Sequence, residues 1–381
     1  MITVPLRIRL VQDVLRSGGT ERQTVLLAHA FRAAGHDVGI VTFRPGGVLS
    51  STLGDIPRRV LQPFDLRLNW FAPRLVSTLR RERPDVVLLM GRMANSRGTS
   101  IAAALPSAVV IGTMRTGKKL PAAFRRSLPH MAHIVANSAE SARSLVATYG
   151  LAPDRVSVIH NALVFPPEPD VRNTNITDSA RATLRAALRA TLGAPPSAVV
   201  LLCVGMLRPE KNQRALIEAA ARLPSALDWR LWFVGEGPAR AECTALATRL
   251  GIAERVRFLG FQSDPRPLYR AADLAVLASR AESLSNFLIE AQAHGLPVVA
   301  ARATGVDECI QENITGTLVA PDDPIALAAA LAEWIAAPAR RAEAAPRAIS
   351  FAREAFAPAA RARAYLDLFH RLHRLHRPEK V

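Results

Sequence analysis

The sequence predicts an α/β protein of two domains, each with a parallel β-sheet between helices. Its 381 residues are more than one small core requires. Short β-rich runs alternate with amphipathic helical stretches, and a polar, Pro-rich stretch interrupts the alternation near the middle of the chain before it restarts. With 49% hydrophobic and 21% charged residues, the composition is that of a globular protein.

The first domain is expected over residues 1–165. Between its first two strands, Val25, Leu26, Ala30 and Phe31 recur at helical spacing. Alternating strands and helices predict a parallel sheet covered on both faces. The candidate strands are Arg7–Asp13, Asp37–Phe43, Asp85–Met90, Ala108–Thr113, His133–Asn137 and Val156–His160.

A linker is expected over residues 166–197, because a polar, Pro-rich stretch precedes a helix at Ser179–Leu192. The second domain is expected over 198–350. Ligands of such sheets bind outside the carboxyl ends of the strands, which is where functional residues are expected. Its candidate strands are Ala198–Val204, Arg230–Val234, Val256–Leu259, Leu274–Leu277 and Pro297–Ala300, with helices at Asn212–Leu223 and Pro324–Ile335.

Two classes of protein are disfavoured by composition. No stretch approaches the roughly 20 apolar residues that span a bilayer, and charges within the N-terminal apolar run favour a strand over a signal peptide. The three cysteines (Cys203, Cys243 and Cys309) are odd in number and far apart, so neither a disulfide framework nor a zinc site is indicated. A cytoplasmic location is expected.

The net charge of +17 is unevenly distributed. Residues 1–165 hold 22 basic and 9 acidic residues, against 27 and 23 in the remainder. A one-sided basic field predicts attraction to an anionic membrane surface or an acidic acceptor. The alternative is a solvated surface whose arginines reflect GC-rich coding, since only four basic residues are lysine. Nucleic acid is disfavoured because no basic stripe is interleaved with aromatic residues.

Two glycines follow the first strand. Gly18 and Gly19 precede a helix, so that backbone amides at its N-terminus would face an anion or a sugar hydroxyl. The dinucleotide fingerprint G-x-G-x-x-G is absent at this turn, which disfavours an NAD-dependent enzyme.

A second candidate is the loop that ends in Arg208, Glu210 and Lys211. A cation at the start of a helix opposes the helix dipole. A diphosphate would resolve that conflict and suit both Arg208 and Lys211. An exposed lysine beside Glu210 is the alternative, and the sequence leaves both open.

The most distinctive local pattern runs from Glu282 to Glu290. The amides of the loop between them would face phosphate at a helix N-terminus. Glu290, about two turns along that helix, is suited to accept both hydroxyls of a ribose. Its apolar neighbours require a partner for the carboxylate, and a salt bridge to an arginine is the structural alternative. The loop residues are Ser283, Leu284, Ser285 and Asn286.

In order and spacing, these motifs closely resemble those of the retaining nucleotide-sugar glycosyltransferases of family 4. The resemblance runs from about Leu6 to Leu331. It implies the GT-B fold, in which two Rossmann-like domains face each other across a cleft. The motifs are, in order, GGTER, VANS, VIHN, VGMLRPEKN, VGEGP, VRFLGF, AADL, E-x7-E and HGLPVVA.

The resemblance implies a role for each candidate. Lys211 matches the lysine that binds the donor diphosphate, with Arg208 beside it, and Glu282 matches the carboxylate next to the donor sugar. These three are the expected catalytic residues. Glu290 resembles the carboxylate that holds the nucleotide ribose.

Further donor contacts are implied at Gly18, Gly19 and Phe261, the last near the base, and at the amides of residues 283–286. The C-terminal helix, about Pro358 to Arg374 within residues 351–381, would cross back to the first domain.

Three positions depart from the family pattern. Met206, Ser283 and Val306 stand where arginine, glycine and glycine are usual, which predicts altered donor choice or reduced activity. The strand end where the family often has a histidine carries Arg115. His130 and His133 are assigned to packing, and no catalytic histidine is predicted.

The predicted function is retaining transfer of a hexose from a nucleoside-diphosphate sugar to a glycan or lipid-linked glycan acceptor, in cell-surface polysaccharide or glycolipid assembly. No cofactor and no obligatory metal are expected, because no D-x-D pair occurs in a suitable context. The enzyme is expected in the cytoplasm, peripherally on the inner face of the membrane. The alternatives are a catalytically impaired nucleotide-sugar-binding protein and a nucleotide-sugar epimerase, although the histidine and glutamate pattern of the epimerases is not found.

Overall fold

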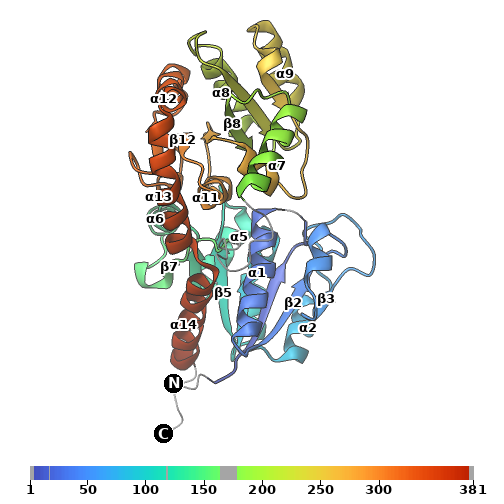
Figure 1. Cartoon of the computed structure of the whole chain (residues 1–381). Coiled ribbons are helices and arrows are strands. Elements are labelled where there is room, and N and C mark those ends of the chain that lie inside the picture. The colour runs from blue at the N-terminus through green and yellow to red at the C-terminus, as the bar shows by residue number, and fades with distance from the viewer. Residues whose placement is uncertain (1–3, 17, 117–118, 164–177, 377–381) are drawn as a thin grey trace. The chain divides into compact units, whose positions relative to one another are not determined.

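The computed structural model describes residues 4–16, 18–116, 119–163 and 178–376. The chain forms two compact units (Figure 1). Unit 1 comprises Met1–Leu163 and Phe356–Val381, and unit 2 comprises Val164–Ala355. Residues 164–177 of the predicted linker lie outside the described residues. In the described part of the chain, every helix is too short or too polar to cross a membrane.

Unit 1 contains a seven-stranded parallel sheet in the order β3-β2-β1-β4-β5-β6-β7. Its inner strands are apolar on both faces, as a sheet between helices requires. The strands are β1 (Arg7–Gln12), β2 (Asp37–Thr42), β3 (Arg58–Val60), β4 (Val86–Leu89), β5 (Val109–Met114), β6 (His133–Ala136) and β7 (Val156–Val158).

Two separate cores cover the faces of this sheet. On one face, α1 (Gly19–Ala33) packs with the C-terminal helix α14 (Pro358–His376), where Phe31 meets Phe369 edge-to-face with centroids 5.4 Å apart. The other face holds α2 (Leu75–Glu82), α3 (Arg92–Asn95), α4 (Gly98–Ala104), α5 (Ala122–Ser127) and α6 (Ala139–Ala147).

Unit 2 contains a six-stranded parallel sheet in the order β10-β9-β8-β11-β12-β13. In both sheets the strand order reverses beside the first strand, so the switch points lie between β1 and β4 and between β8 and β11. The strands are β8 (Val199–Val204), β9 (Trp229–Val234), β10 (Val256–Phe258), β11 (Leu274–Leu277), β12 (Val298–Ala301) and β13 (Gly316–Val319).

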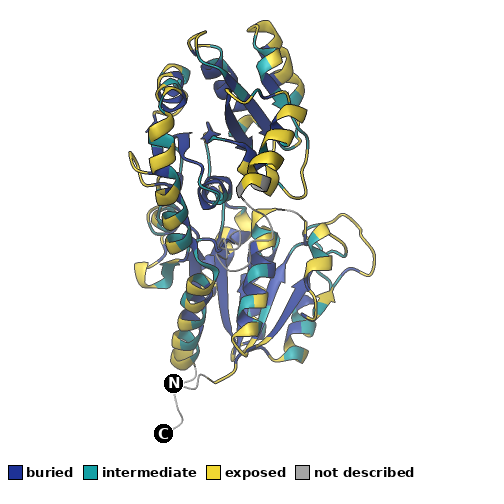
Figure 2. Cartoon of the chain, viewed as in Figure 1, coloured by how far each residue is buried: buried dark blue, intermediate teal, exposed yellow. Residues whose placement is uncertain are grey.

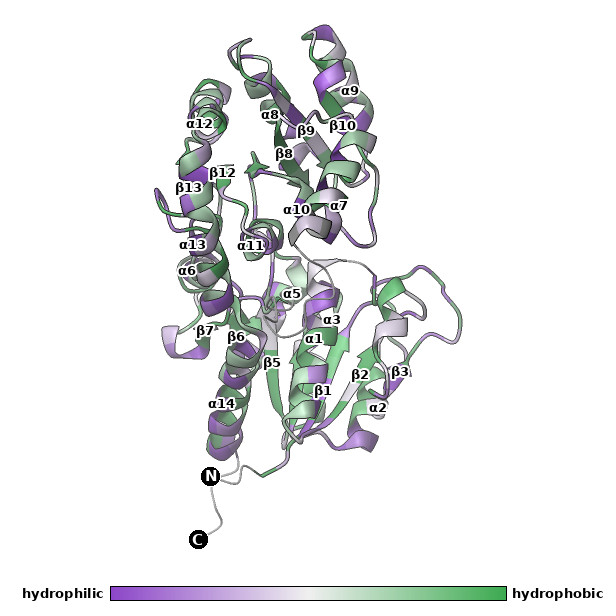
Figure 3. Cartoon of the chain, viewed as in Figure 1, coloured by the Kyte–Doolittle hydropathy of each residue, from purple (hydrophilic) through white to green (hydrophobic). Residues whose placement is uncertain are grey.

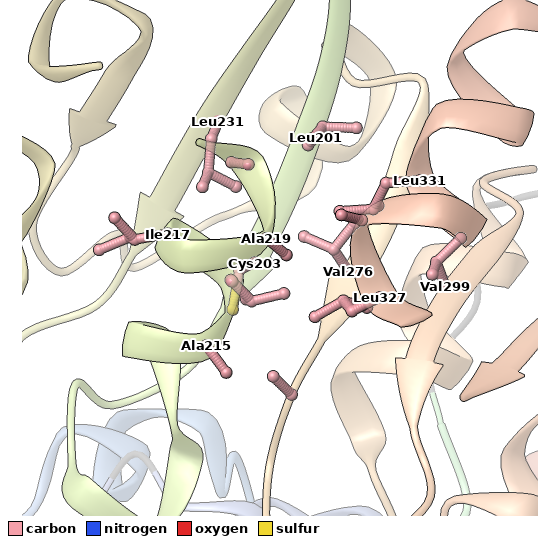
Figure 4. Packing of buried hydrophobic residues seen from close by; sticks show 14 of the residues in the cluster. Leu201, Cys203, Ala215, Ile217, Ala219, Leu231, Val276, Val299, Leu327 and Leu331 are labelled. Carbon is pink, nitrogen blue, oxygen red and sulfur yellow. The ribbon is translucent and has the colours of Figure 1, made fainter. Parts of the chain in front are cut away.

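The main core of unit 2 lies under α8 (Gln213–Ala220) and α12 (Pro324–Ala336), as Figure 4 shows. Leu327 and Leu331 of α12 and Ala215 and Ala219 of α8 cover alternate side chains of the strands, such as Leu201 of β8. The other helices are α7 (Asp178–Thr191), α9 (Arg240–Arg249), α10 (Arg266–Ala271), α11 (Asn286–Ala293) and α13 (Pro338–Phe356).

Burial and hydropathy follow this layering. The strands are buried and apolar, whereas the outward faces of the helices are exposed and more polar (Figures 2 and 3). The predicted strands are confirmed to within about two residues at their ends. Two short strands were missed. β3 is the exposed edge Arg58–Val60, which lacks an apolar run, and β13 begins with glycine.

Candidate functional site

The strongest pair of candidates meets at the switch point of unit 2. Lys211 follows β8 and Glu282 follows β11, and Lys211 Nζ donates to Glu282 Oε1 at 2.6 Å. The two side chains are 29% and 10% exposed. Residues 71 positions apart in the sequence therefore form one ion pair where a Rossmann-type sheet binds ligands.

The loop after β8 differs from its prediction in one respect. Lys211 ends a short 3₁₀ turn, Pro209–Lys211, and the following α8 begins only at Gln213. Asn212 joins the two in a left-handed conformation with φ of 49°. Lys211 thus lies directly before the N-cap residue of α8, and its opposition to the helix dipole stays a prediction. The alternative of an exposed lysine beside Glu210 is wrong, because its partner is Glu282.

Arg208 lies on the same loop. Its side chain is 43% exposed, with Nη1 4.0 Å from Glu210 Oε1, so it can reach a ligand from the loop. Its contact with a diphosphate stays a prediction.

A polar cluster joins the loops after β8, β11 and β13. The backbone N–H of Arg280 donates to the carbonyl of Glu210 at 2.9 Å. Asp322 Oδ1 accepts from Arg280 Nε at 2.7 Å and from Asn212 Nδ2 at 3.0 Å. These contacts hold Lys211 and Glu282 on connected loops. Sequence reasoning missed Arg280 and Asp322, because Asp322 follows the strand that was not predicted.

The loop from Ser283 to Ser285 is buried. The Ser285 N–H donates to Cys309 Sγ at 3.3 Å, so this amide is directed at the thiol and not at a phosphate. Gly305, with φ of 73°, packs so closely that a Cβ there would lie 1.9 Å from the Ser283 carbonyl oxygen. The inward side of this loop is therefore occupied by residues 305–309.

Leu284 and Asn286 are the remaining predicted contacts of this loop. Leu284 is 6% exposed, and Asn286 is the first residue of α11, half-buried. Val306 is fully buried with φ of −75°, and Ser283 is not among the described residues with positive φ. The backbone thus accommodates a side chain at both positions where glycine is usual in the family. The contact of the amides of residues 283–286 with a donor stays a prediction.

Glu290 lies about one turn along α11, rather than two. Its Oε2 accepts a hydrogen bond from the Tyr269 hydroxyl at 2.8 Å, which supplies the partner that its apolar surroundings require. The Tyr269 ring stacks on His294 with centroids 4.9 Å apart. Burial lowers the pKa of His294, which favours a neutral ring in this stack. Tyr269 was missed, because no motif marks it.

Phe261 follows β10 and is 56% exposed. The preceding Gly260 has φ of 70°, and its carbonyl accepts from the Gly235 N–H at 2.8 Å. Gly235 in turn packs against the carbonyl of Gly205, where a Cβ would lie at 2.1 Å. The loops after β10, β9 and β8 are therefore adjacent, and the contact of Phe261 with a base stays a prediction.

In unit 1, Gly18 precedes α1 and Gly19 is its first residue. A Cβ at Gly18 would lie 2.4 Å from Glu21 Oε2, so the carboxylate of Glu21 folds back over the first turn of the helix. Burial raises the pKa of Glu21. The glycine turn is present as predicted, with a carboxylate of the chain itself beside it.

A second carboxylate lies at the switch point of unit 1. Asp13 follows β1 and accepts hydrogen bonds from the backbone N–H groups of Met93 (3.2 Å) and Ala94 (2.9 Å), after β4. Burial raises its pKa to about 6 despite these bonds. Its position at the end of β1 is the signal in the sequence, where Asp13 was interpreted only as a charge within the first strand.

The strand end with Arg115 carries no histidine. Arg115 donates to Asn161 Oδ1 at 2.5 Å and to the Tyr365 hydroxyl at 2.7 Å. His133 is buried on β6, and its Nε2 lies 2.8 Å from Ser157 Oγ. Burial lowers the pKa of His133 to about 4. Arg115 thus joins unit 1 to its own helix α14, and His133 has the packing role that was assigned to it.

Two family models match the chain. Residues 17–163 match "Glycosyltransferase Family 4" and residues 198–337 match "Glycosyl transferases group 1". Together these matches cover well over half of the chain.

Curated relatives carry related names. The chain is 38% identical over 250 residues to D-inositol 3-phosphate glycosyltransferase 2 of Catenulispora acidiphila, covering 62% of this chain and 56% of that protein. It is 38% identical over 148 residues to the lipopolysaccharide core biosynthesis glycosyltransferase LpsE of Rhizobium meliloti, covering 39% and 43%. The chain thus spans about half the length of the curated relatives it matches.

Solved structures share the fold over nearly the whole chain. Anabaena Alr3699/HepE in complex with UDP is 23% identical, with a TM-score of 0.78 and coverage of 95% of this chain and 99% of that one. A glycosyltransferase from Rickettsia africae is 22% identical, with a TM-score of 0.81 and coverage of 97% and 99%. These likenesses confirm the predicted two-domain α/β GT-B fold. With both halves matched by family models, the chain belongs to the family 4 glycosyltransferases.

Proposed function

We propose that this protein transfers a hexose from a nucleoside-diphosphate sugar to a glycan or lipid-linked glycan, with retention at the anomeric carbon. The observation that carries the proposal is the contact between Lys211 and Glu282 at the switch point of unit 2. A cation for the diphosphate and a carboxylate for the sugar lie side by side there. Names of relatives support a nucleotide donor, since HepE was solved with UDP and with UDP-glucose.

The proposed chemistry is electrostatic. As the bond between the anomeric carbon and the diphosphate oxygen breaks, its electron pair passes to the leaving diphosphate. Lys211 and Arg208 lie on the loop where that charge would develop, and stabilising it lowers the barrier. Glu290 would hold the ribose, with Tyr269 fixing its carboxylate. No cofactor and no obligatory metal form part of the proposal, and unchanged turnover in a chelator would support that part.

The acceptor is proposed to be anionic or membrane-borne. Residues 1–165 carry an excess of 13 basic over acidic residues, which attracts phosphorylated acceptors. The relatives named for D-inositol 3-phosphate and for the lipopolysaccharide core agree with such an acceptor. A cytoplasmic site of action, peripheral to the membrane, is part of this proposal.

Calorimetric titration with UDP, GDP and ADP tests the donor site. One diphosphate should bind, and Lys211→Ala and Glu290→Ala should each weaken it at least tenfold. Arg249→Ala, at an exposed position on α9, is the matched control and should bind normally. If none of the three diphosphates binds, the donor proposal fails. Binding without sugar transfer or donor hydrolysis would instead identify a nucleotide-sugar-binding protein.

A further inference from the structure

The segment between β3 and α2 in unit 1 exposes an unusual concentration of apolar side chains. Phe64 is 67% exposed and Trp70 is 58% exposed. Leu66 and Leu68 are each exposed by more than a third, as is Val60 at the end of β3. The segment is largely exposed in Figure 2 as well. A cluster of this kind marks an interaction surface, because isolated apolar residues on a surface are normal but a run of them is not.

Polar contacts fix the backbone of this segment. The buried Gln62 donates through Nε2 to the carbonyls of Leu68 and Phe71, both at 2.7 Å. Arg44 binds Asp65 through two hydrogen bonds of 2.7 and 2.8 Å. Arg44 also donates to Asn69 Oδ1 at 2.6 Å. The amide nitrogen of Gln62 and the carboxylate of Asp65 thus have partners within the protein, while the apolar side chains of the loop remain outside.

A groove of about 370 Å³ adjoins this loop. Three arginines line it, Arg74, Arg80 and Arg97, and Arg97 donates to the Trp70 carbonyl at 2.7 Å. In the part of the chain that the structure describes, no carboxylate forms an ion pair with any of the three. Ser77 and Ser100 add hydroxyls to the same groove. Such a lining suits a phosphate group.

We propose that this loop and groove dock unit 1 on an anionic phospholipid surface. The arginines would bind lipid phosphates, while Trp70 and Phe64 enter the interface above the acyl chains, the depth that tryptophan prefers in membranes. The charge of the region favours lipid over a protein partner. Residues 58–83 hold seven arginines and two acidic residues, and both acids are paired with arginines. This docking rests on the peripheral membrane location in the proposed function and assigns a surface to it, whereas the proposed donor binding does not depend on it.

The tryptophans of this chain provide a direct reporter. Three of the four, Trp229, Trp232 and Trp334, are buried in unit 2, whereas Trp70 is exposed. Vesicles that contain phosphatidylglycerol should shift the emission of Trp70 to shorter wavelength, and lipids brominated in the acyl chains should quench it. Neutral phosphatidylcholine vesicles should do neither at physiological salt.

Vesicle sedimentation of the full chain tests the residues. The double variants Phe64→Ser/Trp70→Ser and Arg74→Glu/Arg80→Glu should each raise the lipid concentration for half-maximal binding at least tenfold. Ile325→Ser, at an equally exposed apolar position on α12, is the control for the first and should bind normally. Arg222→Glu/Arg249→Glu makes the same change of net charge in unit 2 and is the control for the second.

Each outcome decides the proposal. If the natural chain ignores anionic vesicles, or if loop variants and controls lose binding equally, the lipid assignment is overturned. Self-association that Trp70→Ser abolishes, without lipid binding, would assign the loop to a protein interface and also overturn it. Nucleoside-diphosphate binding, measured in parallel, separates this result from the proposed function. The loop variants should retain it, because Arg208, Lys211 and Glu290, which are proposed to bind the diphosphate and the ribose, lie in unit 2.

Discussion

At the scale of single residues, the ion pair between Lys211 and Glu282 holds the lysine in place and should also compete with a diphosphate for its ammonium. With a 2.6 Å contact, the carboxylate takes one of the three N–H groups that the ammonium could donate to a diphosphate. Donor binding should therefore exchange one anion for another. Glu282 would then be released toward the hydroxyls of the donor sugar.

Replacing Glu282 by glutamine should separate binding from turnover. Glu282→Gln removes the competing charge, so affinity for the nucleoside diphosphate should rise about threefold to tenfold, the size of a partly buried ion-pair term. Sugar transfer should fall at least a hundredfold, because the group beside the reacting sugar loses its charge. Calorimetry and a transfer assay measure the two effects. Glu242→Gln, at an exposed position on α9, should change neither, and weaker diphosphate binding in Glu282→Gln would refute the competition.

Tyr269 should act only through Glu290. Tyr269→Phe keeps the ring stack on His294 and removes the hydrogen bond to the carboxylate, a loss of about 1–2 kcal/mol. Affinity for the nucleoside diphosphate should weaken threefold to tenfold in a calorimetric titration. Tyr149→Phe removes a comparable hydroxyl contact in unit 1 and serves as the matched control. Equal effects of the two substitutions would show that Tyr269 does not position Glu290.

His133 should make unit 1 less stable in mild acid. Its pKa is about 4 when folded and 6.5 when unfolded, so the unfolded chain binds the extra proton between these values. Stability from this group is present above pH 6.5 and is lost as the pH falls toward 4. From pH 7 to 5 the contribution of this group alone should fall by about 2 kcal/mol, measured by urea unfolding as the difference between the natural chain and His133→Gln.

Asp13 should have the opposite effect on stability as the pH falls. Its pKa is about 6 when folded and 3.8 when unfolded, so the folded state binds the proton between these values and gains stability as the pH falls through 6. Asp13→Asn should therefore steepen the acid-induced loss that His133→Gln reduces. If both substitutions changed the acid-induced loss of stability in the same direction, these assignments would be contradicted.

At the scale of elements, close contacts between loops set the geometry of the candidate donor site. The loop after β12 reaches the Ser283 carbonyl only because Gly305 has no side chain and adopts φ of 73°. The same contact lets Cys309 accept from the Ser285 N–H. The approach of the two loops thus depends on one glycine.

Gly305→Ala should therefore disturb both stability and binding. The strained conformation costs about 1–2 kcal/mol, and the clash with a backbone oxygen raises the total to about 3 kcal/mol or more. Gly251 has nearly the same φ, 72°, with open space around it, so Gly251→Ala should cost only the strained conformation, about 1–2 kcal/mol. Urea unfolding measures both. Diphosphate binding should weaken in Gly305→Ala alone, and equal costs would show that the loop contact is unimportant.

At the scale of the whole molecule, the two units are distinct in composition and in reporter groups. Unit 2 contains the three buried tryptophans, and unit 1 contains the basic excess and the exposed Trp70. The predicted donor residues after β8 and β11 all lie in unit 2. Ligand binding there stabilises the unit that holds the site.

Heating should accordingly reveal two unfolding transitions that respond differently to a nucleoside diphosphate. A nucleoside diphosphate at a hundred times its Kd should stabilise unit 2 by about 2.7 kcal/mol and raise the transition seen by fluorescence of the buried tryptophans. The other calorimetric transition should stay in place, and Lys211→Ala should abolish the shift. A single transition that moves as a whole would contradict independent unfolding of the units.

The sequence by itself determined the fold class and the principal motifs. Apolar runs such as those of β8 and β11 are buried on both faces of a sheet, so composition alone marks them as inner strands. Because parallel strands end at one edge, position after a strand also located Lys211 and Glu282.

Only the tertiary structure decided which of these residues meet. The pairing of Lys211 with Glu282, the hydroxyl of Tyr269 on Glu290, and the carboxylate of Asp322 at the edge of β13 join positions far apart in the chain. Local periodicity contains no record of such contacts. They depend on strand order, on loop approach and on burial, which requires each polar group to find a partner.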